Sequence, residues 1–162
     1  MNTQIRILKA DIAVDLKAIA EIYTAIHRYA PGPTGEEQRI VVAYYLHNLY
    51  CAFESIFQCI AEVFENQVSD QAGWHAELLR RMTLEIEGVR PRLLSDEAHN
   101  SLEELRRFRH LFRSAYHLHL DADRLALVHK KALVLERVYQ ADIEGFLAFL
   151  DSLLQKETAT DA

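Results

Sequence analysis

Glycine and proline are scarce in this chain, whose 162 residues contain five glycines and three prolines. Nearly all of them lie at residues 31–35, at Gly73 and at residues 88–91, so long stretches have no helix breaker. Leu, Ala, Glu and Arg, which favour helices, are abundant between these breaks. The composition predicts one mostly helical domain over residues 1–156, with a frayed tail at 157–162.

Positive charge is also in the minority, because the formal net charge is -6. This excludes a general nucleic-acid coat, which needs a basic surface, but leaves room for a local basic site. The N-terminal residues form no apolar run of signal-peptide type, and the apolar run at 40–46 is too short to span a bilayer. We therefore expect a cytoplasmic protein without a membrane span.

Cysteine is rare as well, with Cys51 and Cys59 the two in the chain. Eight residues along a helix separate them by about 12 Å, which exceeds the reach of a disulfide. We expect both to be free and packed among apolar side chains.

Apolar residues at spacings of three and four predict five helices with short connections. Their expected ranges are 3–28, 36–66, 74–87, a helix that begins at Ser95, and a last helix capped by Asp121 and Asp123. The second is apolar nearly all round, which is typical of the middle of a bundle. The fold class is therefore all-α, an up-and-down bundle of about five helices.

Residues 105–119 concentrate four arginines, three histidines and a tyrosine within the fourth expected helix. At about 100° per residue, Arg109 and Tyr116 fall in the apolar stripe of that helix and Arg113 lies at its edge. A buried guanidinium must be paired, hydrated in a cleft, or ready for an anion. On spacing alone, an internal ion pair with Glu54 is the simplest interpretation.

Phosphate chemistry is the function that such a cluster fits best, because guanidinium groups bind phosphate oxygens and stabilise charge that develops on them. RNA can be cut without a metal ion when a base activates the 2′-hydroxyl, a cation holds the phosphorane and an acid protonates the leaving oxygen. Histidine is the usual acid and base at neutral pH. Arg106 and Arg113 are further candidates for binding substrate phosphate, although Arg106 can instead be solvated beside Glu103.

The stretch from Arg109 to Tyr116 resembles the signature of HepT-like proteins of the HEPN superfamily, in which an arginine precedes a histidine by five positions and a tyrosine by seven. The wider sequence is similar too. The other segments that carry the resemblance are residues 50–54, 73–75, 78–82, 89–91 and 107–110.

The resemblance implies a dimeric, metal-independent ribonuclease toxin with a composite site between two protomers. It also implies a minimal nucleotidyltransferase antitoxin as partner, and no cofactor. Arg109 would stabilise the phosphate, His110 would be its polar neighbour, Tyr116 would be the possible AMP acceptor and Glu54 would support the site from behind.

Ser114 is the departure from the family pattern, because it occupies the position of the catalytic histidine. A serine hydroxyl is not a base at neutral pH unless another group activates it. Two alternatives to a ribonuclease therefore stay open. One is a non-catalytic subunit that docks a nucleotidyltransferase and presents Tyr116, and the other is a structural helical dimer in which Arg109 is fully paired.

The remaining histidines have simpler interpretations. His110, His117 or His119 could replace the missing imidazole, and Arg113 with His119 offers a second register of the motif. A metal site over residues 117–123 is a minor alternative, because alternating ligands suit a strand better than a helix. Structural roles are expected for His27, His47, His75, His99 and His129.

Overall fold

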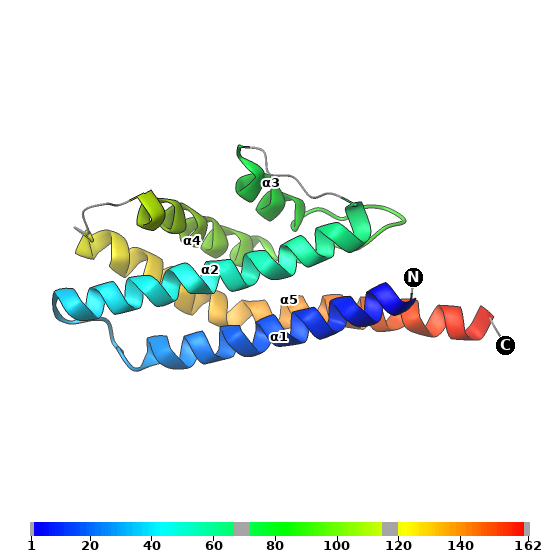
Figure 1. Ribbon diagram of the computed structural model, residues 1–162, viewed down its shortest axis with the longest axis horizontal. Helices are drawn as coiled ribbons and strands as arrows, with labels where there is room; N and C mark the ends of the chain where they lie inside the picture. The colour runs from blue at the N-terminus through cyan, green and yellow to red at the C-terminus, as the bar shows by residue number, and fades with distance from the viewer. Residues whose placement is uncertain (1, 67–71, 115–119, 161–162) are drawn as a thin grey trace.

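The structure describes residues 2–66, 72–114 and 120–160, which contain five helices. Of residues 114 and 157–160 the backbone alone is described. The structure is a computed structural model. In chain order the helices are α1 (Asn2–His27), α2 (Gly35–Glu65), α3 (Trp74–Arg81), α4 (Asp96–Ser114) and α5 (Ala122–Thr160). The four long helices alternate in direction, and both termini lie at the same end of the bundle (Figure 1). The predicted all-α, up-and-down bundle is confirmed.

The second helix, α2, is the centre of the bundle and contacts each of the other four helices. Its buried side chains occupy one broad face of the helix, from Val42 to Ala61, so the expectation that it is enclosed nearly all round is wrong. By length and composition it is also the one helix of the described residues that could cross a membrane. Half of its most apolar window is buried inside the bundle, and a core helix has the same composition. The expected absence of a membrane span stays a prediction.

The long outer helices α1 and α5 bury the apolar stripes that their spacing predicts. Tyr23 of α1 stacks on Tyr139 of α5 with ring centroids 5.9 Å apart, and its hydroxyl donates to the Ala132 carbonyl over 2.8 Å. The same face of α5 runs from Leu125 to Leu150. The α5 backbone is helical to Thr160, and both the predicted fraying of residues 157–162 and the single-domain boundary stay predictions.

The expected third helix is wrong at its C-terminal end, because α3 stops at Arg81 instead of continuing to 87. The Met82 carbonyl accepts from the amides of Leu93 (2.9 Å) and Leu94 (3.0 Å), so it is used by the returning chain. The chain turns back through a bridge between Ile86 and Arg90, with Gly88 at a positive φ of 73°. Gly88 therefore lies within a tight turn and does not end a helix.

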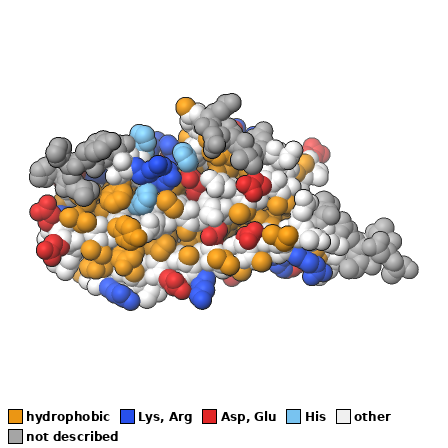
Figure 2. All heavy atoms as spheres, in the orientation of Figure 1, with side chains coloured by type: hydrophobic (Ala, Val, Ile, Leu, Met, Phe, Trp, Pro, Cys, Tyr) orange, Lys and Arg blue, Asp and Glu red, His pale blue; other side chains and the backbone are white. Residues whose placement is uncertain are grey.

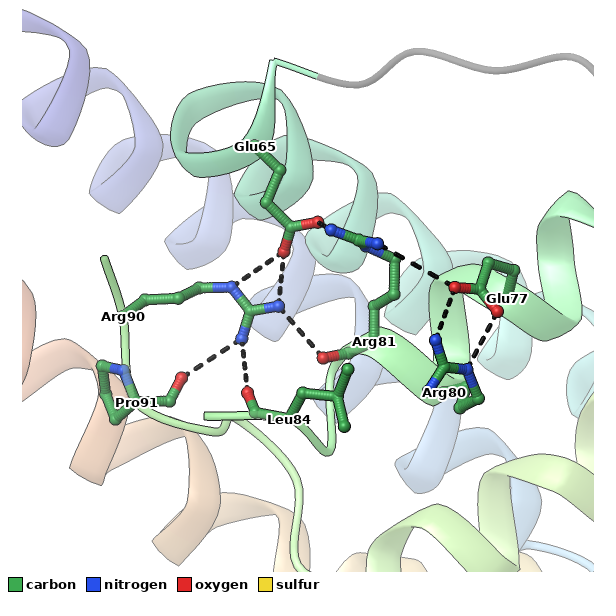
Figure 3. A network of polar contacts seen from close by, with 7 residues as sticks. All are labelled: Glu65, Glu77, Arg80, Arg81, Leu84, Arg90 and Pro91. Carbon is green, nitrogen blue, oxygen red and sulfur yellow. Dashed lines mark hydrogen bonds and ion pairs between the residues drawn. The ribbon is translucent and has the colours of Figure 1, made fainter. Parts of the chain in front are cut away.

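Arg90 holds this returning segment in place (Figure 3). Its side chain is 0% exposed, and its Nε donates to Glu65 of α2 over 3.0 Å. Its two terminal nitrogens donate to Glu65 and to three backbone carbonyls, those of Arg81, Leu84 and Pro91, over 2.5–3.2 Å. Glu65 also pairs with Arg81. The end of α3 is thus satisfied by a side chain, which periodicity alone does not reveal.

The predicted caps at Ser95 and Asp121 are confirmed, whereas Asp123, which was also expected in the cap, lies inside α5. Ser95 Oγ accepts from the Ala98 amide over 3.3 Å at the start of α4. Asp121 Oδ1 accepts from the amides of Asp123 (2.9 Å) and Arg124 (3.2 Å) at the start of α5. These caps set where α4 and α5 begin.

Candidate functional site between α2 and α4

Arg109 lies on α4 with its side chain against α2 and 15% exposed. Its Nη2 is 3.7 Å from Glu54 Oε1, and its Nε donates to Cys51 Sγ over 3.4 Å. The guanidinium carbon also lies 6.0 Å from the centroid of the Tyr50 ring. The ion pair between Arg109 and Glu54 that spacing indicates is confirmed.

Glu54 connects Arg109 to a third helix. Its side chain is 6% exposed, and its second oxygen lies 2.8 Å from His75 Nδ1 of α3. Burial raises the pKa of Tyr50, and the Glu54 carboxylate raises it further. The Tyr50 hydroxyl lies near enough to Glu54 for this electrostatic effect, but it makes no hydrogen bond of ordinary geometry to a described residue. Glu54, on α2, thus holds Arg109 of α4 and His75 of α3 at the same carboxylate.

The guanidinium of Arg109 is charged yet only partly used. Burial lowers the pKa of Arg109, but the contacts with Cys51 and Glu54 outweigh burial and raise it above its usual value. No hydrogen bond from Nη1 or Nη2 to a described residue accompanies the contacts above. A fixed cation with unused N–H groups and partial exposure is suited to an anionic ligand.

The other arginines of α4 differ in how they are paired. Arg106 donates through Nε and Nη2 to the two oxygens of Glu103, each over 2.8 Å, and this pairing raises the pKa of Arg106. Arg107 pairs with Glu103 and Glu104. Arg113 is exposed and pairs with no carboxylate of the described residues. Phosphate binding stays a prediction for both Arg106 and Arg113, and Arg106 would have to exchange Glu103 for it.

His47 is the residue of this site that sequence reasoning missed. Its ring packs on Phe112 of α4 with centroids 5.2 Å apart, and its Nε2 lies 3.8 Å from Cys51 Sγ. Burial lowers the pKa of His47, and the charges of Arg109 and Arg113 lower it further. The signal was available: His47, Cys51 and Glu54 follow one face of α2 at intervals of four and three.

Several predicted site residues fall outside what the structure describes. Tyr116, His117 and His119 lie outside the described residues, and of Ser114 the backbone alone, at the end of α4, is described. His110 is exposed on α4. The roles predicted for His110, Ser114 and Tyr116 therefore stay predictions.

A metal centre gains no support from the described part of the chain. No group of three or more His, Cys, Asp or Glu side chains there is placed to hold an ion. Asp121, one of the ligands considered for residues 117–123, is used as the cap of α5. Both cysteines are free, as expected, but Cys51 contacts the polar groups of His47 and Arg109 and is not packed among apolar side chains alone.

The site between α2 and α4 continues onto the surface of the protein. Figure 2 shows histidine and arginine or lysine side chains gathered there beside a broad hydrophobic area. Tyr44 of α2, one helical turn before His47, is 54% exposed. The site is therefore a basic patch with an exposed aromatic ring at its border, on a protein of net negative charge.

Comparison with known proteins identifies a family. No curated protein and no solved structure matches this chain. The family model for HepT-like proteins matches residues 41–150, which include most of α2, all of α3 and α4, and most of α5. That range contains His47, Glu54 and Arg109. The chain therefore belongs to the HepT-like protein family.

Proposed function

We propose that this HepT-like protein is the toxin component of a toxin–antitoxin pair and cleaves RNA without a metal ion at the site between α2 and α4. Arg109 binds the scissile phosphate and stabilises the charge of the phosphorane. Arg113 draws the RNA backbone to the site. The observation that carries the proposal is the charged Arg109, held by Glu54 and Cys51, whose terminal nitrogens donate no hydrogen bond to a described residue, beside Arg113, which pairs with no described carboxylate.

Single-stranded RNA is the proposed substrate. Side chains that read unpaired RNA commonly combine cations for the backbone with aromatic rings on which bases stack. Tyr44 supplies an exposed ring one turn from His47. The net charge of -6 limits phosphate contacts to this patch, so binding should be short and local.

The proposed assembly follows the family. A homodimer would bring two copies of the site together, and a minimal nucleotidyltransferase antitoxin would attach AMP to Tyr116. An AMP group close to Arg109 would compete with the RNA phosphate for the same cation. An RNA substrate and this partner are consistent with action in the cytoplasm.

The test is cleavage of a single-stranded RNA in the presence of a chelator. We expect the wild type to give products that end in a 2′,3′-cyclic phosphate, and Arg109→Ala to reduce the rate by about 100-fold or more. Arg92→Ala is a matched control, because Arg92 is a half-exposed arginine that pairs with Asp96 at the other end of α4. Equal rates for the wild type and Arg109→Ala would refute the proposal.

A non-catalytic docking subunit is the second candidate, and Ser114 in the place of the motif histidine is the observation that favours it. Ser114→His separates the two. A strong gain of RNA cleavage would identify a weakened enzyme. No cleavage by either form, together with tight binding of a nucleotidyltransferase, would identify a docking subunit.

A further inference from the structure

His47 differs from His27 and His75 in what surrounds its ring. His27 bonds to Glu136 over 2.8 Å, and His75 bonds to Glu54 over 2.8 Å, so each has a carboxylate that holds it. The Nδ1 of His47 is buried and has no hydrogen-bond partner among the described residues. A buried polar atom without a partner costs free energy, which is unusual for a histidine that serves structure alone.

The groups that face His47 come from two helices. Cys51 contacts it from α2, while Phe112, Arg109 and Arg113 face it from α4. Cys51 Sγ contacts both His47 Nε2, at 3.8 Å, and Arg109 Nε, at 3.4 Å, so the imidazole and the guanidinium share one sulfur atom as a neighbour. A phosphate bound by Arg109 would therefore lie beside His47.

The charge state of His47 suits a proton acceptor. Burial lowers its pKa, and the two arginines lower it further, so the environment favours the neutral ring. None of the groups named above is a carboxylate that would raise it again. A general base must be unprotonated at the working pH, and this environment favours that form.

We propose that His47 is the general base of RNA cleavage at this site. It would replace the motif histidine, whose position Ser114 occupies. This inference rests on the proposed function. The imidazole takes the proton of the 2′-hydroxyl, and the 2′-oxygen forms a bond to phosphorus while Arg109 holds the phosphorane. The bond from phosphorus to the 5′-oxygen breaks, and that oxygen takes a proton from water. The imidazolium returns its proton to the resulting hydroxide.

The products are a 2′,3′-cyclic phosphate and a 5′-hydroxyl end. The proposal places the base on α2 and the phosphate-binding cation on α4, so the site depends on the packing of these two helices. It also requires a 2′-hydroxyl on the substrate, because the proton that His47 removes comes from that group.

The experiment uses the full chain and a DNA oligonucleotide with one internal ribonucleotide, in chelator, from pH 5 to 8. We expect His47→Gln to lower the cleavage rate by about 100-fold or more and to lose the fall in rate at acidic pH. His27→Gln, the same change at a remote histidine, should keep both the rate and its pH profile. Binding of the all-DNA oligonucleotide should change less than about twofold in His47→Gln.

Chemical rescue guards against a folding artefact. Free imidazole should restore part of the rate of His47→Ala and none of the rate of Arg109→Ala. A His47→Gln protein that cleaves at the wild-type rate, or an His47→Ala protein that imidazole does not rescue, would overturn the assignment of His47 alone. A wild type no faster than Arg109→Ala would overturn the proposed function as well.

Discussion

Arg90 and Arg109 each pack against a glutamate of the same central helix, and they are held in different ways. Arg90 uses all of its nitrogens on Glu65 and three carbonyls, and it is 0% exposed. Arg109 meets Glu54 at 3.7 Å, donates to a sulfur atom and keeps 15% of its side chain exposed. A saturated arginine can only support the fold, whereas an arginine with unused N–H groups can also bind a ligand.

The largest expected effect is on stability, from Arg90→Ala. Loss of this side chain leaves Glu65 with one partner and removes one donor from each of three carbonyls, so the free energy of unfolding should fall by about 4 kcal/mol. Urea unfolding followed by circular dichroism measures this change. Arg109→Ala should cost about 2 kcal/mol or less by the same assay, because its contacts are longer and fewer. Equal costs would break the distinction between the two arginines.

Glu54→Gln tests the second site with little change of shape. The variant removes the charge that faces Arg109 but keeps an oxygen for His75, so we expect a loss of about 1–2 kcal/mol in unfolding free energy. Loss of the same charge should lower the pKa of Tyr50, which an absorbance titration of the tyrosines can follow. Glu65→Gln is the matched control and should cost more, because two arginines face Glu65.

The pH dependence of stability should also distinguish the Arg109 site, which includes His47, from the Arg90 site. Burial lowers the pKa of both His47 and His129, with help from Arg109 and Arg113 at His47 and from His27 at His129. The unfolded chain therefore takes up protons first, and stability should fall as the pH drops below about 6.5. Each unit of pKa difference contributes about 1.4 kcal/mol at the acidic limit.

His47→Gln should flatten this acid limb, which urea unfolding at pH 7.5 and 5.5 can show. The hydrogen bonds of Arg90 to the described residues include none to a histidine, so Arg90→Ala should lower stability by the same amount at both pH values. An unchanged acid limb in His47→Gln would indicate that another group carries the dependence.

The smallest expected effect on stability is at Arg106, where Arg106→Gln should change the unfolding free energy by about 0.5 kcal/mol, because the pair with Glu103 is partly solvated. Binding of RNA should respond to Arg113→Gln more than to Arg106→Gln, since Glu103 already occupies Arg106. A salt titration of RNA binding can compare them, and Arg113→Gln should reduce the salt dependence by about one ion. A larger effect of Arg106→Gln would restore it as a phosphate ligand.

Patterns within single helices were predictable to a large extent. The stripe from Leu125 to Leu150, the caps at Ser95 and Asp121, and the central place of α2 all follow from spacing and local chemistry. The end of α3 was not predictable in this way. Its carbonyls are taken by Arg90, Leu93 and Leu94, which return to it from later in the chain.

The candidate site divides along the same line. The sequence by itself determined that Arg109 lies on the inner face of its helix and that Glu54 was in reach, because helical periodicity decides both. The tertiary structure alone decided that the pair leaves Arg109 partly unused and that His47 joins it through Cys51. Those facts depend on how deeply α4 packs against α2, and the distance between two helices is set by the side chains of both, which no single helix encodes.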